Sequence, residues 1–342
     1  MANLAAAPPV VHHAAMSNPA VVFTAANQVQ LLDVPMPPPS AGQIRVRSRV
    51  SVVSNGTESW VWRNEFTWSA TPFPCVPGYQ RAGVVEAVGA GVTNVQPGQV
   101  VMACNGSWDG PIKPFWGSHI AVANSQEVYP LPAGMDETDA AGLVVAQVGY
   151  NAASRIQAQA GAWVAVFGDG IIGQCGAQAA RARGFRVVLI GRRRERLDLA
   201  AKHSADQVMD GREKDLPAAV RSVIGAKTVA AVIDTIQNPA AQSSYLPLLE
   251  NGTGQIVYSG FTPGTAWADM AKLQQQELTT HFVAGWNRPR MEATLALLAS
   301  GRMRLAPLIT HRVTWRDAVA AYEQMRDRSG PLMAIAIDWT GA

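Results

Sequence analysis

A glycine-rich segment in the middle of the chain constrains the fold most strongly. Residues 163–167 form a short apolar run, and three glycines follow at the spacing GxGxxG before an alanine-rich stretch. In this pattern the first glycine permits a tight turn, the second lets the backbone approach a pyrophosphate, and the third allows a helix to pack closely on a strand. The segment predicts a strand, a turn and a helix whose N-terminus binds dinucleotide phosphates, and the alternative is a glycine-rich turn without a ligand. The residues expected at the cofactor are Gly168, Gly170, Ile171, Ile172 and Gly173.

The sequence pattern of the chain changes near residue 150. Before it, short β-rich runs such as 44–53 and 82–88 are broken by Pro and Gly, which is typical of an irregular, mostly antiparallel β domain. After it, apolar strands alternate with helical patterns, which predicts a parallel sheet covered on both faces. These strands are expected at 163–167, 186–190, 230–234 and 255–259, with helices at 174–183 and 194–203.

The end of the second of these strands indicates which nicotinamide cofactor fits. A site for NAD(H) carries an acidic residue there, which accepts hydrogen bonds from the ribose hydroxyls. This chain has Gly191 at that place, followed by Arg192 and Arg193. Because guanidinium groups make charge-assisted hydrogen bonds to a 2′-phosphate, we predict a preference for NADP(H), with Arg192 as the first candidate contact. The alternative is that these arginines belong to a solvated turn.

Composition and charge argue against several other classes of protein. The 342 residues suffice for two domains, and 48% hydrophobic with 15% charged residues is typical of a soluble globular chain. The formal net charge of +3 argues against a nucleic-acid partner. Cys75, Cys104 and Cys175 lack CxxC spacing, which argues against a disulfide scaffold and indicates a reducing, cytoplasmic compartment. No apolar run reaches the roughly 18 residues of a membrane span, and residues 1–18 are expected to form a flexible extension.

Three further motifs flank the glycine-rich segment. Residues 77–85 read PGYQRAGVV, residues 88–101 carry VG followed by VQPGQVV, and residues 232–234 read VID. In this order the motifs resemble those of the medium-chain dehydrogenase/reductase superfamily over nearly the whole chain. The resemblance implies an α/β fold with an N-terminal GroES-like β domain, a doubly wound Rossmann domain and a cleft between them, usually in a homodimer or homotetramer. We expect the GroES-like catalytic domain at 19–147 and 297–342, and the NADP(H)-binding Rossmann domain at 148–296.

The same resemblance shows where the chain departs from zinc-dependent members of the superfamily. Their ligands lie in a Cys-Gly-Ser/Thr-Asp stretch, in a Gly-His-Glu segment and at a third position farther along the chain. This chain has Asn55, Tyr79 and, near the third position, Val144. These side chains do not supply the thiolate, imidazole or carboxylate ligands that zinc requires, and the four-cysteine structural loop is missing as well. We therefore expect no catalytic zinc.

Without a metal, hydrogen-bond donors must stabilise a developing alkoxide. Thr57 matches the hydroxyl that resembles the superfamily's proton-relay residue, and Tyr79 can aim its phenolic O–H into the cleft. Glu58 is expected to orient these groups or to contact substrate. The alternative is that the hydroxyls are structural groups in a filled-in metal site.

An aromatic cluster, WVWRNEFTW at 60–68, follows the expected relay residue. In the resemblance this region borders the substrate pocket, and flat rings there would suit a bulky or aromatic substrate, whereas core packing is the alternative. The expected substrate contacts are Trp60, Trp62, Gln80 and Gln147. Arg288 is expected to contact a cofactor phosphate, with a surface position as its alternative.

These expectations leave three functions open. The first is an enzyme that moves a hydride between NADP(H) and an alcohol/carbonyl pair of a small molecule. Residues 56–58 resemble the zinc-less hydroxyethyl bacteriochlorophyllide dehydrogenases, which favours this function. The second is an NADPH-dependent reductase of activated C=C bonds or quinones, although such members resemble one another in an Asn-Pro-x-Asp stretch that this chain lacks. The third is an NADPH-binding protein that has lost its chemistry.

Overall fold

A parallel sheet forms the centre of the Rossmann domain in the computed structural model, which describes residues 17–66, 68–262, 267–327 and 331–342. Its strands are β10 (Trp163–Phe167), β11 (Arg186–Gly191), β12 (Gln207–Asp210), β13 (Ala231–Asp234), β14 (Gln255–Tyr258) and β15 (Thr279–Phe282). They lie in the order β12-β11-β10-β13-β14-β15 and pair in parallel throughout. The chain order reverses between β10 and β13, and ligands of such sheets bind beyond the carboxyl ends of the strands at this switch point.

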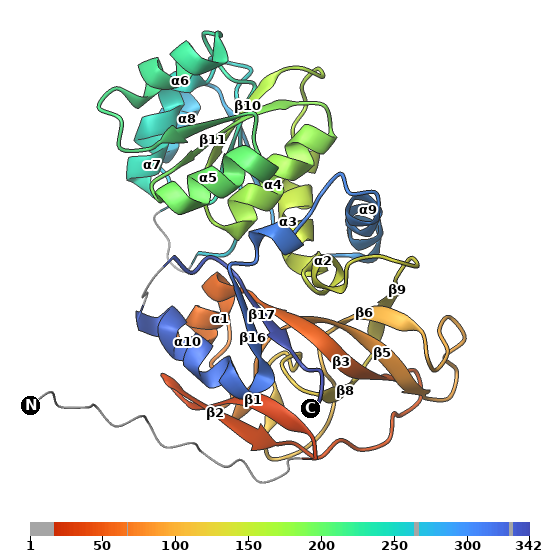
Figure 1. Ribbon diagram of the computed structural model, residues 1–342. Coiled ribbons are helices and arrows are strands. Elements are labelled where there is room, and N and C mark those ends of the chain that lie inside the picture. The colour runs from red at the N-terminus through yellow and green to blue at the C-terminus, as the bar shows by residue number, and fades with distance from the viewer. Residues whose placement is uncertain (1–16, 67, 263–266, 328–330) are drawn as a thin grey trace, which may run out of the picture.

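Helices cover both faces of this sheet, as the alternating pattern predicted. Strand β10 is buried along its whole length, because a strand with helices on both sides meets no solvent. The covering helices are α3 (Leu143–Ser154), α4 (Ile171–Ala182), α5 (Arg194–His203), α6 (Leu216–Ile224), α7 (Pro239–Tyr245), α8 (Met270–Gln275) and α9 (Arg288–Ala299), with a 3-10 turn η1 (Leu246–Leu248). Figure 1 shows α3 and α9 on the side of this domain that meets the β domain.

The β domain combines a four-stranded and a seven-stranded sheet among the described residues. Its elements are β1 (Pro19–Ala25), β2 (Gln28–Asp33), β3 (Ile44–Val53), α1 (Asn55–Trp62), β4 (Cys75–Val76), β5 (Gln80–Val88), β6 (Val100–Cys104), β7 (Lys113–Pro114), β8 (Val122–Ser125), β9 (Glu127–Pro130) and α2 (Glu137–Ala141). The seven-stranded sheet runs β16-β17-β3-β5-β6-β9, with β8 also paired to β3.

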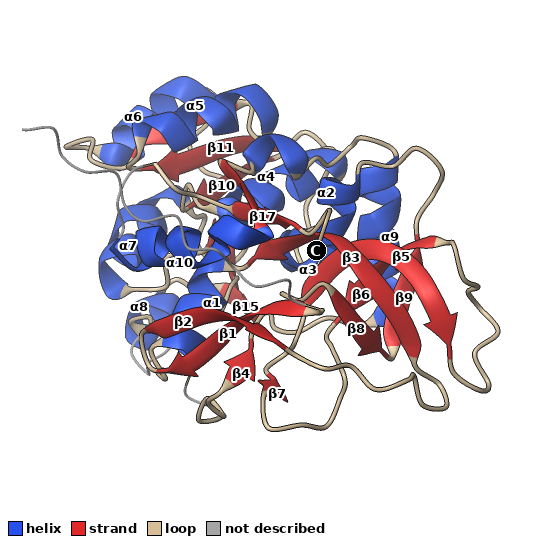
Figure 2. Cartoon of the chain, turned by 60° about the horizontal axis from the view of Figure 1, so that its bottom comes forward, coloured by secondary structure: helices blue, strands red, loops and turns tan. Residues whose placement is uncertain are grey.

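The end of the chain returns to this β domain. Its elements are η2 (Ala306–Leu308), β16 (His311–Thr314), η3 (Trp315–Asp317), α10 (Ala318–Asp327) and β17 (Ile335–Asp338). Strand β17 pairs antiparallel with β3, and Figure 2 shows the two strands side by side. The predicted α/β class is confirmed, since a β domain with two sheets is joined to a domain with a six-stranded parallel sheet.

The described helices include none that is long and apolar enough to cross a membrane. The expected cytoplasmic location and homo-oligomeric state stay predictions, and the flexible extension expected at 1–18 falls almost entirely outside the described residues.

Candidate active site

The turn after β10 has the geometry that its glycines require. Gly168 has a φ of +120°, and a Cβ atom there would lie 2.0 Å from Oγ1 of Thr235. At Gly173 a Cβ atom would lie 2.0 Å from the carbonyl oxygen of Gly168. Gly170, by contrast, faces open space, and α4 begins directly after it without a side-chain cap. The first N–H groups of α4 are therefore free to bind an anion, as the motif predicted.

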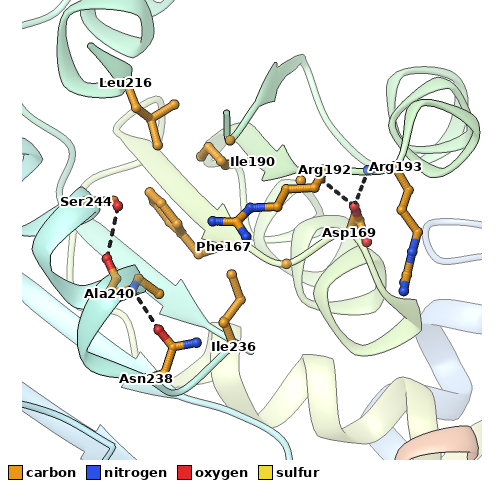
Figure 3. A pocket seen from close by; sticks show the side chains of 14 residues that line it. Phe167, Asp169, Ile190, Arg192, Arg193, Leu216, Ile236, Asn238, Ala240 and Ser244 are labelled. Carbon is orange, nitrogen blue, oxygen red and sulfur yellow. Dashed lines mark hydrogen bonds between the residues drawn. The ribbon is translucent and has the colours of Figure 1, made fainter. Parts of the chain in front are cut away.

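A cavity of about 360 Å³ lies beside this turn. Its wall is largely apolar, and both Arg192 and Arg193 line it. Figure 3 shows Arg192 reaching across the cavity toward Phe167, whereas Arg193 extends along the other side of Asp169. Neither guanidinium group forms a hydrogen bond or an ion pair with a described residue. The cavity thus offers an apolar surface for a flat ring and free positive charge for a phosphate.

A second cavity, of about 410 Å³, lies where the two domains meet. Ile171 and Ile172 from the glycine-rich turn line one side of it, and the loop at the start of α1 lines the other. The described residues that line it include no Asp, Glu, Lys, Arg or His. This cavity adjoins the cofactor turn and accepts an uncharged, apolar molecule more readily than an ion.

The residues that stand where zinc-dependent members have their ligands come together in this second cavity. Asn55, Tyr79 and Val144 all line it. The Nδ2 atom of Asn55 donates to the carbonyl oxygen of Met333 at 2.9 Å, and its buried Oδ1 atom has no partner among the described residues. Within the described parts of the chain, no group of three or more His, Cys, Asp or Glu residues could hold a metal ion.

Tyr79 lies in a pocket of hydroxyl groups and indole rings. Burial raises the pKa of Tyr79 above its ordinary value, the nearby charge of Glu58 raises it further, and side-chain hydrogen bonds with Ser54 and Thr57 lower it. The ring is packed by Trp116, with ring centroids 5.6 Å apart in an edge-on arrangement. The phenol therefore stays protonated at neutral pH and can donate a hydrogen bond.

Glu58 lies behind this pocket and does not line it. Its Oε1 atom accepts the backbone N–H of Ser54 at 2.7 Å, which ties the start of α1 in the manner of a capping box. Its Oε2 atom lies 3.0 Å from Nε2 of His119 and also accepts the hydroxyl of Tyr322. All three side chains of this buried cluster are fully enclosed. Of the two roles expected for Glu58, the structure is consistent with orientation and not with substrate contact.

The two tryptophans expected at the substrate lie elsewhere. Trp62 is 1% exposed and packs between Phe23 and Tyr322 in the β-domain core. Trp60 lies outside both cavities, with the guanidinium group of Arg63 4.8 Å above its ring. The reason is that α1 places Trp62 on its inward face, four residues after the buried Glu58.

Gln80 and Gln147 are also placed differently from what we expected. Gln80 is fully buried: its Nε2 donates to the carbonyl oxygen of Val52 at 3.2 Å, and its Oε1 accepts the N–H of Val145 at 3.1 Å. It joins β5 to α3 and lines neither cavity. Gln147 is equally buried, with a long 3.4 Å contact from Nε2 to the carbonyl oxygen of Gly285 and an unpartnered Oε1.

Arg288 lines neither cavity. Its guanidinium group lies 4.5 Å above the ring of Tyr129 and 3.4 Å from Glu292 on the same helix. This position agrees with the alternative that Arg288 lies at the surface, and not with a contact to a cofactor phosphate.

The aromatic wall of the second cavity comes mostly from segments that sequence analysis did not connect. Only Phe66 and Trp68 belong to the expected cluster. The remaining rings are Tyr79, Trp116, Tyr258, Phe261, Trp267, Phe282 and Trp286. Phe261 packs against both members of the expected cluster, with ring centroids 4.9 Å from Phe66 and 4.4 Å from Trp68. No local sequence pattern predicts this contact, because it joins the β domain to the loop after β14.

Comparison with known proteins gives two family models along the chain. An alcohol dehydrogenase GroES-like domain matches residues 40–132, and a zinc-binding dehydrogenase model matches residues 172–300. An alcohol dehydrogenase from Cupriavidus necator is 26% identical over 368 aligned positions, which cover 93% of this chain and 98% of that protein.

Two solved structures share the fold over 94% of this chain and 99% of theirs. One is described as a zinc-binding dehydrogenase from Sinorhizobium meliloti 1021 bound to NADP, with a TM-score of 0.81 and 18% identity. The other is described as a short chain alcohol dehydrogenase from Escherichia coli CFT073 in complex with NADH, with a TM-score of 0.80 and 20% identity. Both domain models match in chain order and one relative matches nearly the full length, and together these findings support the medium-chain dehydrogenase/reductase superfamily.

Proposed function

We propose that the chain is a zinc-independent oxidoreductase that transfers a hydride between NADP(H) and an alcohol/carbonyl pair of a bulky, uncharged aromatic substrate. One observation carries this proposal. The hydroxyl of Tyr79 lies with Ser54 and Thr57 in an uncharged aromatic cavity that adjoins the glycine-rich cofactor turn. A proton donor and a hydride source are therefore brought to one space.

The hydroxyl groups of Ser54, Thr57 and Tyr79 take the role that zinc has as a Lewis acid in zinc-dependent members. A bound nicotinamide supplies or removes the hydride at the reacting carbon. In the direction of reduction Tyr79 donates its phenolic proton to the substrate oxygen, and in the direction of oxidation it accepts a proton from that oxygen. Ser54 and Thr57 line the same cavity, and the half-buried Thr57 provides a hydroxyl through which the proton is exchanged. The N-terminal end of α1 adds a favourable field for negative charge at this place.

Zinc does not fit this site. An unpartnered amide oxygen from Asn55, a neutral phenol from Tyr79 and the apolar Val144 leave no set of anionic or imidazole ligands among the described residues. We therefore assign the polarisation of the carbonyl to hydrogen bonds.

The cofactor preference follows from the first cavity. Arg192 and Arg193 line it with guanidinium groups that no described residue pairs, and Gly191 carries no carboxylate that would repel a 2′-phosphate. The structural neighbours bind NADP in one case and NADH in the other, so the preference for NADP(H) rests on these residues.

The lining of the second cavity supports the proposed substrate class. Flat rings suit an aromatic or extended conjugated substrate, and the lack of charged lining residues in the described chain disfavours a carboxylate or a phosphate. The substrate is therefore expected to be a neutral aryl ketone or the matching secondary alcohol.

Oxidation of NADPH by the purified protein tests the proposal. Neutral aryl ketones are compared with enones and quinones of equal size, and with the same ketones bearing a carboxylate. Turnover of neutral ketones, with reverse activity on their alcohols, is expected. Turnover confined to enones or quinones would instead assign the chain to double-bond reduction. Tight NADPH binding without turnover of any acceptor would identify a binding protein.

A further inference from the structure

Asp169, the residue between the first two glycines of the turn, occupies space next to Gly191. A Cβ atom at Gly191 would lie 2.4 Å from Cβ and 2.6 Å from Oδ2 of Asp169. Real Cβ atoms do not approach other heavy atoms this closely, so a side chain at 191 and the present side chain at 169 exclude each other. Gly191 has no positive φ, so its backbone alone would admit another residue.

The carboxylate of Asp169 is directed at the backbone of the turn after β11. Its Oδ2 atom accepts the N–H of Arg192 at 2.7 Å and the N–H of Arg193 at 2.9 Å. Its Oδ1 atom lies 3.5 Å from a guanidinium nitrogen of Arg196, whose side chain is 13% exposed. The negative charge is thus balanced by two amides and a partly buried arginine.

We propose that Asp169 is a specificity-determining residue of the cofactor site. It fills the space of an acidic residue at 191, the position that selects NAD(H), and it fixes the backbone so that Arg192 and Arg193 diverge around it (Figure 3). This inference rests on the proposed preference for NADP(H). The inference adds that residues 169 and 191 set the preference together. An acidic side chain at 191 cannot take up the position that selects NAD(H) while Asp169 fills that space.

A mutant cycle on the full chain tests this coupling. Dissociation constants for NADPH and NADH are measured by fluorescence titration of wild type, Gly191→Asp, Asp169→Gly and the double variant. Glycine is required at 169, because the Cβ atom itself is part of the collision. Gly191→Asp alone should weaken NADPH binding without improving NADH binding. The double variant should bind NADH about tenfold more tightly than Gly191→Asp does, a non-additive effect.

A second cycle keeps the inference testable if Gly191→Asp does not fold. Gly191→Ala should lower the melting temperature without cofactor, and Asp169→Gly in the same chain should restore most of the loss. Equal NADH affinity in Gly191→Asp and the double variant, or additive melting temperatures in the alanine cycle, would overturn the inference. A wild-type protein that binds NADH as tightly as NADPH would refute the proposed cofactor preference instead, and the alanine cycle would still report the contact.

Discussion

The carboxylate of Glu58 lies 3.0 Å from Nε2 of His119, and both side chains are fully buried behind the first turn of α1, which carries Thr57. Nδ1 of the same ring lies 2.8 Å from Oγ of Ser51, which also accepts the indole N–H of Trp339 at 2.9 Å. Because an indole nitrogen only donates and a carboxylate only accepts, every bond is satisfied when the proton of His119 sits on Nε2. One buried carboxylate thus connects the start of α1 to Tyr322 on α10.

The Glu58→Gln variant should lower the free energy of unfolding by about 1–3 kcal/mol, because the amide turns an acceptor into a donor and leaves a buried N–H unpaired. Urea denaturation measures this loss. Glu65→Gln is the matched control, since that carboxylate is half exposed and pairs with Arg63 at the surface. Its effect should stay below about 0.5 kcal/mol. Similar losses for the two variants would mean that the buried cluster is not specially stabilising.

The Tyr79→Phe variant should reduce turnover of aryl ketones by about 100-fold or more, because the donor to the substrate oxygen is lost. The dissociation constant for NADPH should not change, since Tyr79 lies outside the nucleotide cavity. Steady-state kinetics and fluorescence titration separate the two effects. Tyr150→Phe, on α3 and outside both cavities, is the control. Full activity of Tyr79→Phe would show that Tyr79 is not the proton donor.

Local features were predictable from the sequence because local sterics determine them. Gly168 has a positive φ, and a Cβ atom at Gly173 would meet the carbonyl oxygen of Gly168, so the turn itself requires both glycines. A wholly apolar run such as β10 implies burial on both faces. Tyr79 and Thr57 were singled out because their motifs resemble those of the superfamily, and both line the second cavity.

The remainder of the site depends on long-range packing. Trp62 was expected at the substrate, yet helical spacing from Glu58 directs it inward, a signal that could have been used. Phe261 and Trp116 line the cleft from loops far apart in the chain, and no periodicity relates them. The contact between Asp169 and Gly191 joins two turns whose separate motifs say nothing of each other.

The Arg192→Asp variant should weaken NADPH binding by about 10- to 100-fold, because a charge-assisted contact to the 2′-phosphate is lost and a repulsive charge is added. Binding of NADH should change much less. Arg194→Asp is the control, since Arg194 is exposed, pairs with Asp198 and lies outside the cavity. If both variants weaken NADPH binding equally, the effect is one of net charge and not of a specific contact.

Treatment with a chelator should leave turnover and melting temperature unchanged, because the described residues at the cleft provide no ligand set for zinc. The protein is purified in metal-free buffers, and its metal content is measured by elemental analysis together with activity. Zinc bound in a one-to-one ratio, with activity lost on its removal and regained on its return, would show that the site recruits ligands that we have not assigned.

The buried thiols of Cys75 and Cys175 should make stability fall at alkaline pH. Burial raises the pKa of each from 9.0 to about 12. Because the folded pKa lies above the unfolded one, the stabilising contribution is complete below pH 9 and is lost as the pH rises toward 12. At about pH 10 each thiol should have lost roughly 1 kcal/mol. Urea denaturation of the wild type and of Cys175→Ala, at several values between pH 8 and 10, should show a shallower decline for the variant. Identical slopes would mean that the thiol already titrates freely in the folded protein, and it would then react with thiol reagents without unfolding.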